Sequence, residues 1–252
     1  MKIDFGPPHQ RPALMELWQV AFGDTPAFIH RFFETAYVPS RCRCVTVAGE
    51  LAAALYWFDV ACEGQKMAYI YAVATAPAWR GRGLCRKLMA DTHACLAQDG
   101  YHGALLVPEG ETLRRMYRSF GYKNCTTLRE FAATAGDAPL ALTPLHREDF
   151  ARLRRELLPH GALLQENENL AYLETFAQFY AGEGCLAVLT QNGNQVFCPE
   201  ILGDPDQAPG ILRALGAAEG TFRCPGAGMD FAMFLPLHPD AVTPRYFAFA
   251  FD

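Results

Sequence analysis

The segment 67–107 constrains the fold most, because it has the pattern of a strand, a loop, a helix and a second strand in close succession. The stretch "MAYIYAVAT" (67–75) is rich in residues that favour strands, and residues 84–98 repeat apolar side chains at helical spacing. "GALLVP" (103–108) is continuously apolar, which is typical of a strand buried on both faces. A strand–helix–strand unit of this length predicts two parallel neighbouring strands.

The elements around this unit complete a first region of mixed structure. Its pattern predicts helices at 12–20, from Pro26 onward behind an Asp24 or Thr25 cap, and at 111–120, with strands at 44–47 and 51–60 and an extended segment at 122–131. The order α-α-β-β-β-α-β-α-β predicts an α/β fold with a mixed sheet.

A shift to small residues, Gly and Pro between 132 and 144 predicts a linker. We therefore predict a first domain at 1–133, a linker at 134–144 and a second, smaller α/β domain at 145–252. The pattern of that domain predicts helices at 148–157, 168–180 and 209–215, and strands at 185–190, 195–202, 221–224, 231–235 and 246–251. This order echoes the first region, although no residue-level repeat accompanies it.

Charge and composition exclude several classes of partner. Of 252 residues, 51% are hydrophobic and 19% charged, and the net charge is −5. A weakly acidic chain argues against nucleic acid as the main partner and is compatible with a cationic small molecule or a basic peptide. No apolar run reaches the ~18 residues of a membrane helix, and the first residues lack a signal-peptide pattern, so we expect a cytoplasmic protein. The nine irregularly spaced cysteines predict neither a disulfide framework nor a metal site.

The loop Arg80-Gly81-Arg82-Gly83 stands directly before the 84–98 helix, where a chain can bind an anion. The first amides of a helix lack internal partners, the helix dipole adds positive charge, and glycine allows close approach of a ligand. The loop does not match a nucleotide-binding Gly-Lys-Ser/Thr pattern, and the third glycine of a dinucleotide motif falls on Arg86. A basic loop that merely joins strand to helix remains the alternative.

Two stretches carry a resemblance to a known family. Residues 73–85, "VATAPAWRGRGLC", resemble motif A of the GCN5-related N-acetyltransferases, with Arg80 and Gly83 at matching positions and Cys85 where Gly or Ala is usual. Residues 116–122, "MYRSFGY", resemble the second signature of that family, although Gly110 stands where Asn is common. The resemblance covers about residues 1–131.

Within that family, the chain is most similar to the enhanced-intracellular-survival type, which implies an N-terminal GNAT fold followed by a degenerate GNAT-like second domain. The resemblance further implies acetyl-CoA as cosubstrate and an amine-bearing small molecule or peptide as acceptor. The amides of Gly81, Arg82, Gly83, Leu84, Cys85 and Arg86 would hold the pyrophosphate, with charge from Arg80, Arg82 and Arg86. The pantetheine arm would pair near Val73 and Thr75, and the N–H near Ala74 would polarise the thioester carbonyl.

The same resemblance assigns the general acid to Tyr117, whose phenol is protonated at neutral pH. For the base that deprotonates the amine, Glu109 is the first candidate because it directly follows the buried strand. Asp59, Glu63 and the terminal carboxylate of Asp252 are further candidates.

Other side chains have several interpretations. Aromatic residues such as Trp18, Phe28, Phe32, Tyr56, Trp57 and Phe58 are equally good acceptor-pocket walls and core residues. His93 and His102 are expected in packing or surface roles.

Two other functions remain open. The chain is alternatively a non-catalytic acyl-CoA-binding sensor or scaffold, or an unrelated phosphate-binding α/β protein. The sequence also leaves the oligomeric state open, including a homo-oligomer.

Overall fold

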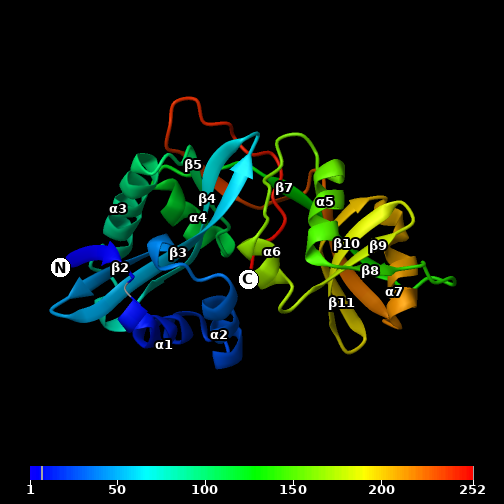
Figure 1. Cartoon of the computed structure of the whole chain (residues 1–252), viewed down its shortest axis with the longest axis horizontal. Helices are drawn as coiled ribbons and strands as arrows, with labels where there is room; N and C mark the ends of the chain where they lie inside the picture. The colour runs from blue at the N-terminus through cyan, green and yellow to red at the C-terminus, as the bar shows by residue number, and fades with distance from the viewer. Residues whose placement is uncertain (7, 252) are drawn as a thin grey trace. The chain divides into compact units, whose positions relative to one another are not determined.

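The computed structural model describes residues 1–6 and 8–251. These form two compact units, Met1–Lys123 with Met233–Val242, and Asn124–Ala232 with Thr243–Asp252. Each unit contains one seven-stranded sheet with helices packed on it (Figure 1). The predicted boundary lay at 133–134, whereas residues 124–133 belong to the second unit because the strand they contain pairs with the second sheet.

Among the described residues, the first unit holds four α-helices, and their bounds agree closely with the sequence pattern. The helices are α1 (Arg11–Phe22), α2 (Pro26–Thr35), α3 (Leu84–Gln98) and α4 (Gly110–Arg118). The strands are β1 (Lys2–Phe5), β2 (Cys42–Val47), β3 (Glu50–Cys62), β4 (Gln65–Thr75), β5 (Gly103–Leu106) and β14 (Met233–Pro236), with β6 (Lys123–Asn124) at the sheet edge. Thr25 caps α2 by accepting a hydrogen bond from the Phe28 amide at 3.2 Å.

The two faces of the first sheet bury different side chains. Tyr56 on β3 packs against Trp18 of α1 and Phe32 of α2, with ring centroids 5.4 and 5.1 Å apart. The neighbouring Leu55 and Trp57 point to the opposite face, into the cluster that contains Leu88 of α3. This alternation follows from the two-residue period of a strand, and it places α1 and α2 on one face and α3 on the other.

The second unit contains the helices α5 (Arg147–Leu157), α6 (Glu168–Leu173) and α7 (Ala208–Leu215). Its strands are β7 (Thr127–Thr134), β8 (Thr143–Leu145), β9 (Gln178–Gly182), β10 (Cys185–Asn192), β11 (Gln195–Gly203), β12 (Glu219–Pro225) and β13 (Met229–Asp230). The Asn192-Gly193 turn joins β10 and β11 as an antiparallel hairpin, as the sequence predicted.

The two sheets have the same strand order and orientation. The first runs β1-β2-β3-β4-β5-β14-β6 and the second, in the same sense, β8-β9-β10-β11-β12-β7-β13. In both, the fourth and fifth strands are parallel, and the sixth is antiparallel to the fifth. The sixth strands are exchanged along the sequence, because β14 follows the helices and strands of the second unit yet belongs to the first sheet, while β7 precedes the second unit's helices.

Three sequence predictions differ from the structure. Residues 2–5 form an edge strand that the sequence did not predict. The predicted helix 168–180 ends at Leu173, and residues 178–182 instead form β9, which pairs with both β8 and β10 and buries Phe179 against Phe150 at a centroid distance of 4.3 Å. The predicted strand 246–251 is buried but is not a strand.

The backbone of that last segment is held by a side chain instead. Gln165, which is completely buried, donates to the Phe249 carbonyl at 2.9 Å and accepts from the Phe249 amide at 3.1 Å. A side-chain amide therefore supplies the hydrogen bonds that a neighbouring strand would otherwise provide.

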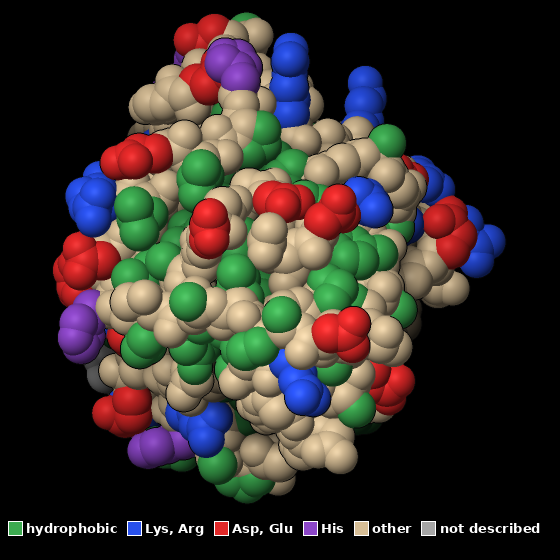
Figure 2. All heavy atoms as spheres, turned by 90° about the vertical axis from the view of Figure 1, so that its right-hand side faces the viewer, with side chains coloured by type: hydrophobic (Ala, Val, Ile, Leu, Met, Phe, Trp, Pro, Cys, Tyr) green, Lys and Arg blue, Asp and Glu red, His purple; other side chains and the backbone are tan. Residues whose placement is uncertain are grey.

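Charged side chains on one face of the molecule are mixed with hydrophobic ones. On the face shown in Figure 2, acidic and basic groups lie singly among hydrophobic ones and do not gather into a basic patch. No helix among the described residues is long and apolar enough to cross a membrane.

Candidate active site

The parallel strands β4 and β5 diverge from one another. They pair at only three positions, from Met67 with Gly103 to Tyr69 with Leu105, although β4 continues to Thr75. Beyond this point β4 contains a bulge, where the register against β3 shifts and Ala72 adopts a φ of 47°. Within the described residues, β4 therefore has no pairing with β5 from residue 70 onward, including Val73, Ala74 and Thr75.

The glycine loop lies at the carboxyl end of β4. Gly81 and Gly83 have φ values of 74° and 72°, in the left-handed region that favours glycine. Gly83 is the N-cap of α3 and makes no side-chain capping bond, and a Cβ at either glycine would meet nothing within 4 Å. The first-turn amides of α3 thus lie beside open space, as an anion site at a helix N-terminus requires.

Two of the loop arginines have local partners. Arg80 Nε donates to the Thr75 carbonyl at 3.1 Å, which ties the loop to the end of β4. The Arg82 guanidinium lies over the Trp79 ring, 4.7 Å from its centroid. Both side chains are exposed, so they contribute positive charge at the loop surface.

Arg86 has a structural role that its place in the motif did not indicate. Its Nη1 donates to the Ser119 carbonyl at 3.0 Å, and its Nη2 donates to the Ser119 hydroxyl at 2.9 Å. The guanidinium also lies 4.5 Å from the centroid of the Phe120 ring. Arg86 therefore links the first turn of α3 to the end of α4, where the second sequence signature lies.

Tyr117 and Cys85 both contact one core cluster of the first unit. Tyr117 is buried in the core cluster that includes Leu84, and Cys85 packs against the same cluster. Burial raises the pKa of the Tyr117 phenol well above its usual range, and the neighbouring Cys85 raises it further. Burial also raises the pKa of the Cys85 thiol. Both groups are therefore protonated at neutral pH, and no described residue accepts a hydrogen bond from the Tyr117 hydroxyl.

The carboxylates that are candidates for the general base lie at opposite ends of the strands. Glu109 is exposed and precedes α4 at its N-cap position, at the same carboxyl edge as the glycine loop. Asp59 pairs with Ala68 in the β3–β4 register, six residues before Ala74, which is roughly 20 Å along the strand. Asp59 is also ion-paired with Arg41 at 2.7 Å and accepts a hydrogen bond from Tyr101.

A further base candidate lies at the opposite end of β4. Glu63 lies in the β3–β4 turn with a φ of 48°, next to the amino end of β4. Asp252 lies outside the described residues. Of the base candidates among the described residues, Glu109 is the one that lies at the carboxyl ends of β4 and β5.

Most of the aromatic residues that the sequence offered as pocket walls belong to the core. Their side chains are almost completely buried; they are Trp18, Phe32, Tyr56, Trp57 and Phe58. Phe28 is half-buried. The acceptor pocket is therefore not identified by these aromatic residues.

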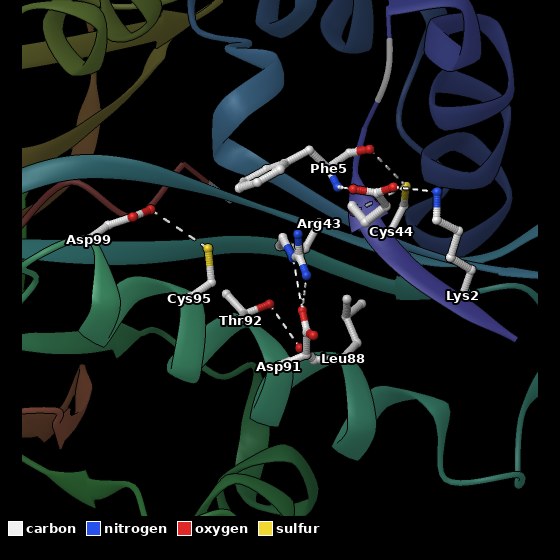
Figure 3. A network of polar contacts seen from close by, with 10 residues as sticks. Lys2, Phe5, Arg43, Cys44, Leu88, Asp91, Thr92, Cys95 and Asp99 are labelled. Carbon is white, nitrogen blue, oxygen red and sulfur yellow. Dashed lines mark hydrogen bonds and ion pairs between the residues drawn. The ribbon is translucent and has the colours of Figure 1, made fainter.

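A cavity of about 620 Å³ lies at the β1 edge of the first sheet, between β1, β2 and the short helices η1 (Pro8–Gln10) and η2 (Pro39–Arg41). Lys2, Phe5 and Cys44 line it, and the Cys44 thiol donates to the Asp4 and Phe5 carbonyls at 3.6 and 3.8 Å (Figure 3). None of its lining residues belongs to β4, the glycine loop or α4. This cavity is therefore separate from the candidate active site.

Comparisons with known proteins agree with this arrangement. The family model described as "Acetyltransferase (GNAT) domain" matches residues 7–125. A GCN5-related N-acetyltransferase from Kribbella flavida superposes with a TM-score of 0.74 at 18% identity, over 95% of this chain and 72% of that one. Eis1 from Mycobacterium abscessus superposes with a TM-score of 0.70 at 14% identity, over 94% of this chain and 74% of that one.

A GCN5-related N-acetyltransferase from Anabaena variabilis gives a TM-score of 0.72 at 15% identity, over 94% of this chain and 73% of that one. A comparison with curated protein sequences finds no match. The structural likenesses extend over both sheets, so both halves have a GNAT-like fold. Residues 7–125 thus match the GNAT acetyltransferase domain family, and the chain as a whole shares the fold of the GNAT structures on which it superposes.

Proposed function

We propose that the chain is an acetyl-CoA-dependent N-acetyltransferase that acetylates a primary amine of a small molecule or peptide. The observation that carries this proposal is the coincidence of two features at one sheet edge. The divergence of β4 from β5 leaves a strand edge open, and the glycine loop presents uncapped amides beside it. Ligands of sheets with parallel strands bind at the carboxyl ends of those strands.

The residues at this edge suit the parts of acetyl-CoA. The amides from Gly81 to Arg86, with the charge of Arg80 and Arg82, fit a pyrophosphate group. The open side of β4 at Val73 and Thr75 fits an amide-bearing arm that adds as a further strand. When bound, acetyl-CoA would supply the acetyl thioester, and the N–H near Ala74 would polarise its carbonyl.

Tyr117 has the properties of a donor to the departing sulfur. As the C–N bond forms and the C–S bond breaks, the sulfur must gain a proton. The raised pKa of the phenol keeps it protonated, but also makes it a weak acid for a thiolate of ordinary pKa, ~8.5. We therefore infer that Tyr117 first stabilises the sulfur by a hydrogen bond, and that burial of the thiolate raises its pKa and favours completion of the transfer.

Glu109 is our candidate for the base that takes a proton from the amine. It lies eight residues before Tyr117 on the same helix, which corresponds to about 12 Å along the helix axis. The two side chains therefore do not act on a single atom, and a water molecule between Glu109 and the amine fits the distance.

The second unit lacks the corresponding anion site. Its α7 occupies the place of α3, but Pro209 in the first turn has no N–H, and Asp204 and Asp206 precede the helix. Negative charge at this position opposes a pyrophosphate. We propose that only the first unit binds acetyl-CoA.

The test compares glycines at the two ends of α3. Gly83 and Gly100 have φ values of 72° and 77°, and a Cβ at either meets nothing within 4 Å, so valine introduces similar strain at both. Gly83→Val should abolish the increase in melting temperature caused by acetyl-CoA, whereas Gly100→Val should retain it. Normal binding by Gly83→Val would contradict the proposed cradle.

A thiol-release assay with polyamines, aminoglycosides, amino acids and peptides then tests turnover. We expect CoA release with at least one amine, and a substantial loss of kcat in Tyr117→Phe with retained binding of acetyl-CoA. Binding without turnover across the panel would instead favour the non-catalytic sensor.

A further inference from the structure

Three side chains with metal-ligating atoms meet in the first unit, outside the candidate active site. His102 immediately precedes β5, and His238 and Asp240 follow β14. His102 Nε2 lies 3.9 Å from Asp240 Oδ1, and His238 Nδ1 forms a hydrogen bond with the same carboxylate oxygen. One ligand atom from each residue lies within 4.8 Å of the other two. The sequence predicts a packing or surface role for His102, and no pattern connects it with His238, which is 136 residues away.

The segment that carries two of these ligands is held in place by bonds that do not use the ligand atoms. The amides of Leu237 and His238 both donate to the His102 carbonyl, at 2.8 and 3.2 Å. Gln65 Nε2 donates to the Asp240 carbonyl at 3.0 Å, and Gln65 Oε1 accepts from the Val242 amide at 2.8 Å. The backbone on both sides of the cluster is therefore fixed without a bound ion.

The cluster is accessible from solvent on one side. The side chains of His238 and Asp240 are 61% and 64% exposed, and that of His102 is 31% exposed. His102 Nδ1 is buried and has no hydrogen-bond partner. Packing rather than a hydrogen bond therefore orients this ring, with its Nε2 near Asp240.

We propose that His102, His238 and Asp240 form a binding site for a divalent transition metal ion, and that Zn²⁺ suits it best. Two imidazole nitrogens and one carboxylate oxygen are ligands that zinc commonly takes, whereas Mg²⁺ and Ca²⁺ prefer oxygen alone. Ligand atoms of a tetrahedral zinc lie about 3.4 Å apart. The exposed His238 and Asp240 side chains need only small rotations to reach that spacing, and water completes the coordination.

Binding changes the protonation of the His238–Asp240 pair. The ion replaces the proton between His238 Nδ1 and Asp240 Oδ1, and this proton moves to His238 Nε2 or is released to solvent. Because β5 and β14 are antiparallel neighbours, the ion cross-links the start of β5 to the segment that leaves β14. The site lies at the amino end of β5, opposite the glycine loop, so it is independent of the proposed acetyl transfer.

The site is tested with the full chain, freed of any polyhistidine tag and stripped of metal by a chelator. Zn²⁺ is titrated in competition with a chromophoric indicator. We expect one Zn²⁺ ion to bind per chain. Its Kd should be only roughly micromolar, because no hydrogen bond to His102 Nδ1 fixes that ring further. His238→Ala and Asp240→Asn should each weaken binding by at least about tenfold.

His30 provides a matched control. It is similarly exposed and lies 3.8 Å from a carboxylate oxygen of Glu34, but it belongs to no three-ligand group among the described residues. His30→Ala should bind Zn²⁺ as tightly as the unmodified chain. Equal affinity in His238→Ala, Asp240→Asn and the unmodified chain, or no stoichiometric binding at all, would overturn the proposal.

Co²⁺ distinguishes this site from binding to cysteine. A site of nitrogen and oxygen ligands gives visible d–d absorption without the near-ultraviolet charge-transfer band of sulfur ligation. A sulfur band that persists in His238→Ala would show that the metal binds to thiols instead. Both exposed positions tolerate substitution without loss of core packing, and circular dichroism of the metal-free variants verifies that they are folded.

Discussion

His93 and Tyr122 form a hydrogen bond of 2.8 Å between the imidazole Nε2 and the phenol hydroxyl, inside the first unit. Tyr122 is almost completely buried, and its ring packs edge-on against that of Tyr117, with centroids 5.8 Å apart. His93 therefore supports the aromatic residue against which the proposed general acid packs, which is a packing role of the kind that the sequence predicted.

His93 should make stability depend on pH in the acidic range. Burial lowers the pKa of His93 from 6.5 to about 4, so the folded state resists protonation. The unfolded chain takes up the proton first, and stability is therefore full above pH 6.5 and declines as the pH falls toward 4. At 1.36 kcal/mol per pKa unit, the loss approaches about 3 kcal/mol.

Chemical denaturation at pH 7.5 and pH 4.5 measures this difference. His93→Gln should reduce the pH dependence, whereas substitution of the exposed His146 by glutamine should leave it unchanged. An identical pH dependence in His93→Gln and the unmodified chain would contradict the assignment.

Cys85→Ala should leave the Kd for acetyl-CoA within about threefold of the unmodified chain. An anion site at a helix N-terminus uses backbone N–H groups, and alanine retains the N–H at position 85. Isothermal titration calorimetry provides the measurement. Cys95→Ala, in the same helix but remote from the loop, is the control. A loss of tenfold or more confined to Cys85→Ala would indicate that the thiol itself contacts the ligand.

Arg86→Ala should lower the free energy of unfolding by about 1–2 kcal/mol, because it removes two hydrogen bonds to Ser119 and the contact with the Phe120 ring. Ser119→Ala should reproduce part of that loss, since it removes only the hydroxyl acceptor. Thermal and urea denaturation measure both variants. Unchanged stability in Arg86→Ala, combined with lost acetyl-CoA affinity, would show that Arg86 serves the ligand rather than the contact between α3 and α4.

The buried ion pair of the second unit should respond differently to single and double substitution. Arg154 and Glu200 are 2% and 1% exposed and are joined by two hydrogen bonds of 2.6 and 2.9 Å. Either Arg154→Met or Glu200→Leu leaves one buried charge unpaired, which should cost about 3–5 kcal/mol. The double variant should recover most of this loss in urea denaturation. A double variant as unstable as the sum of the single variants would contradict this account.

Local patterns in the sequence predicted most elements of the fold. Gly83 and the apolar stripe of α3 mark the glycine loop and its helix, and the structure places both at the predicted residues. The prediction of one helix across 168–180 was wrong in its second half. The spacing of Leu173, Phe176 and Tyr180 suits a helix, but the pairing of β9 with strands on both sides outweighs that local preference.

Contacts between distant residues could not be predicted in the same way. The hydrogen bonds from Arg86 to Ser119 and between His93 and Tyr122 depend on how α3 packs against the end of α4. The strand–helix–strand pattern predicted the parallel pair of β4 and β5, but the pairing of β14 with β5 leaves no signal in the residues themselves, because an apolar four-residue strand suits many partners. The same holds for the meeting of His102 with His238.

The exchanged positions of β7 and β14 in the sequence determine how late the first sheet can be completed during synthesis. The ribosome completes β5 at Leu106, but the strand that covers its free edge begins at Met233, 127 residues later. At a synthesis rate of roughly 5–20 residues per second, the edge of β5 stays unpaired for about 6–25 s before β14 is made. The proposed catalytic half is thus among the first parts made and among the last completed, and a ribosome that stops between the two strands leaves an open sheet edge rather than a finished domain.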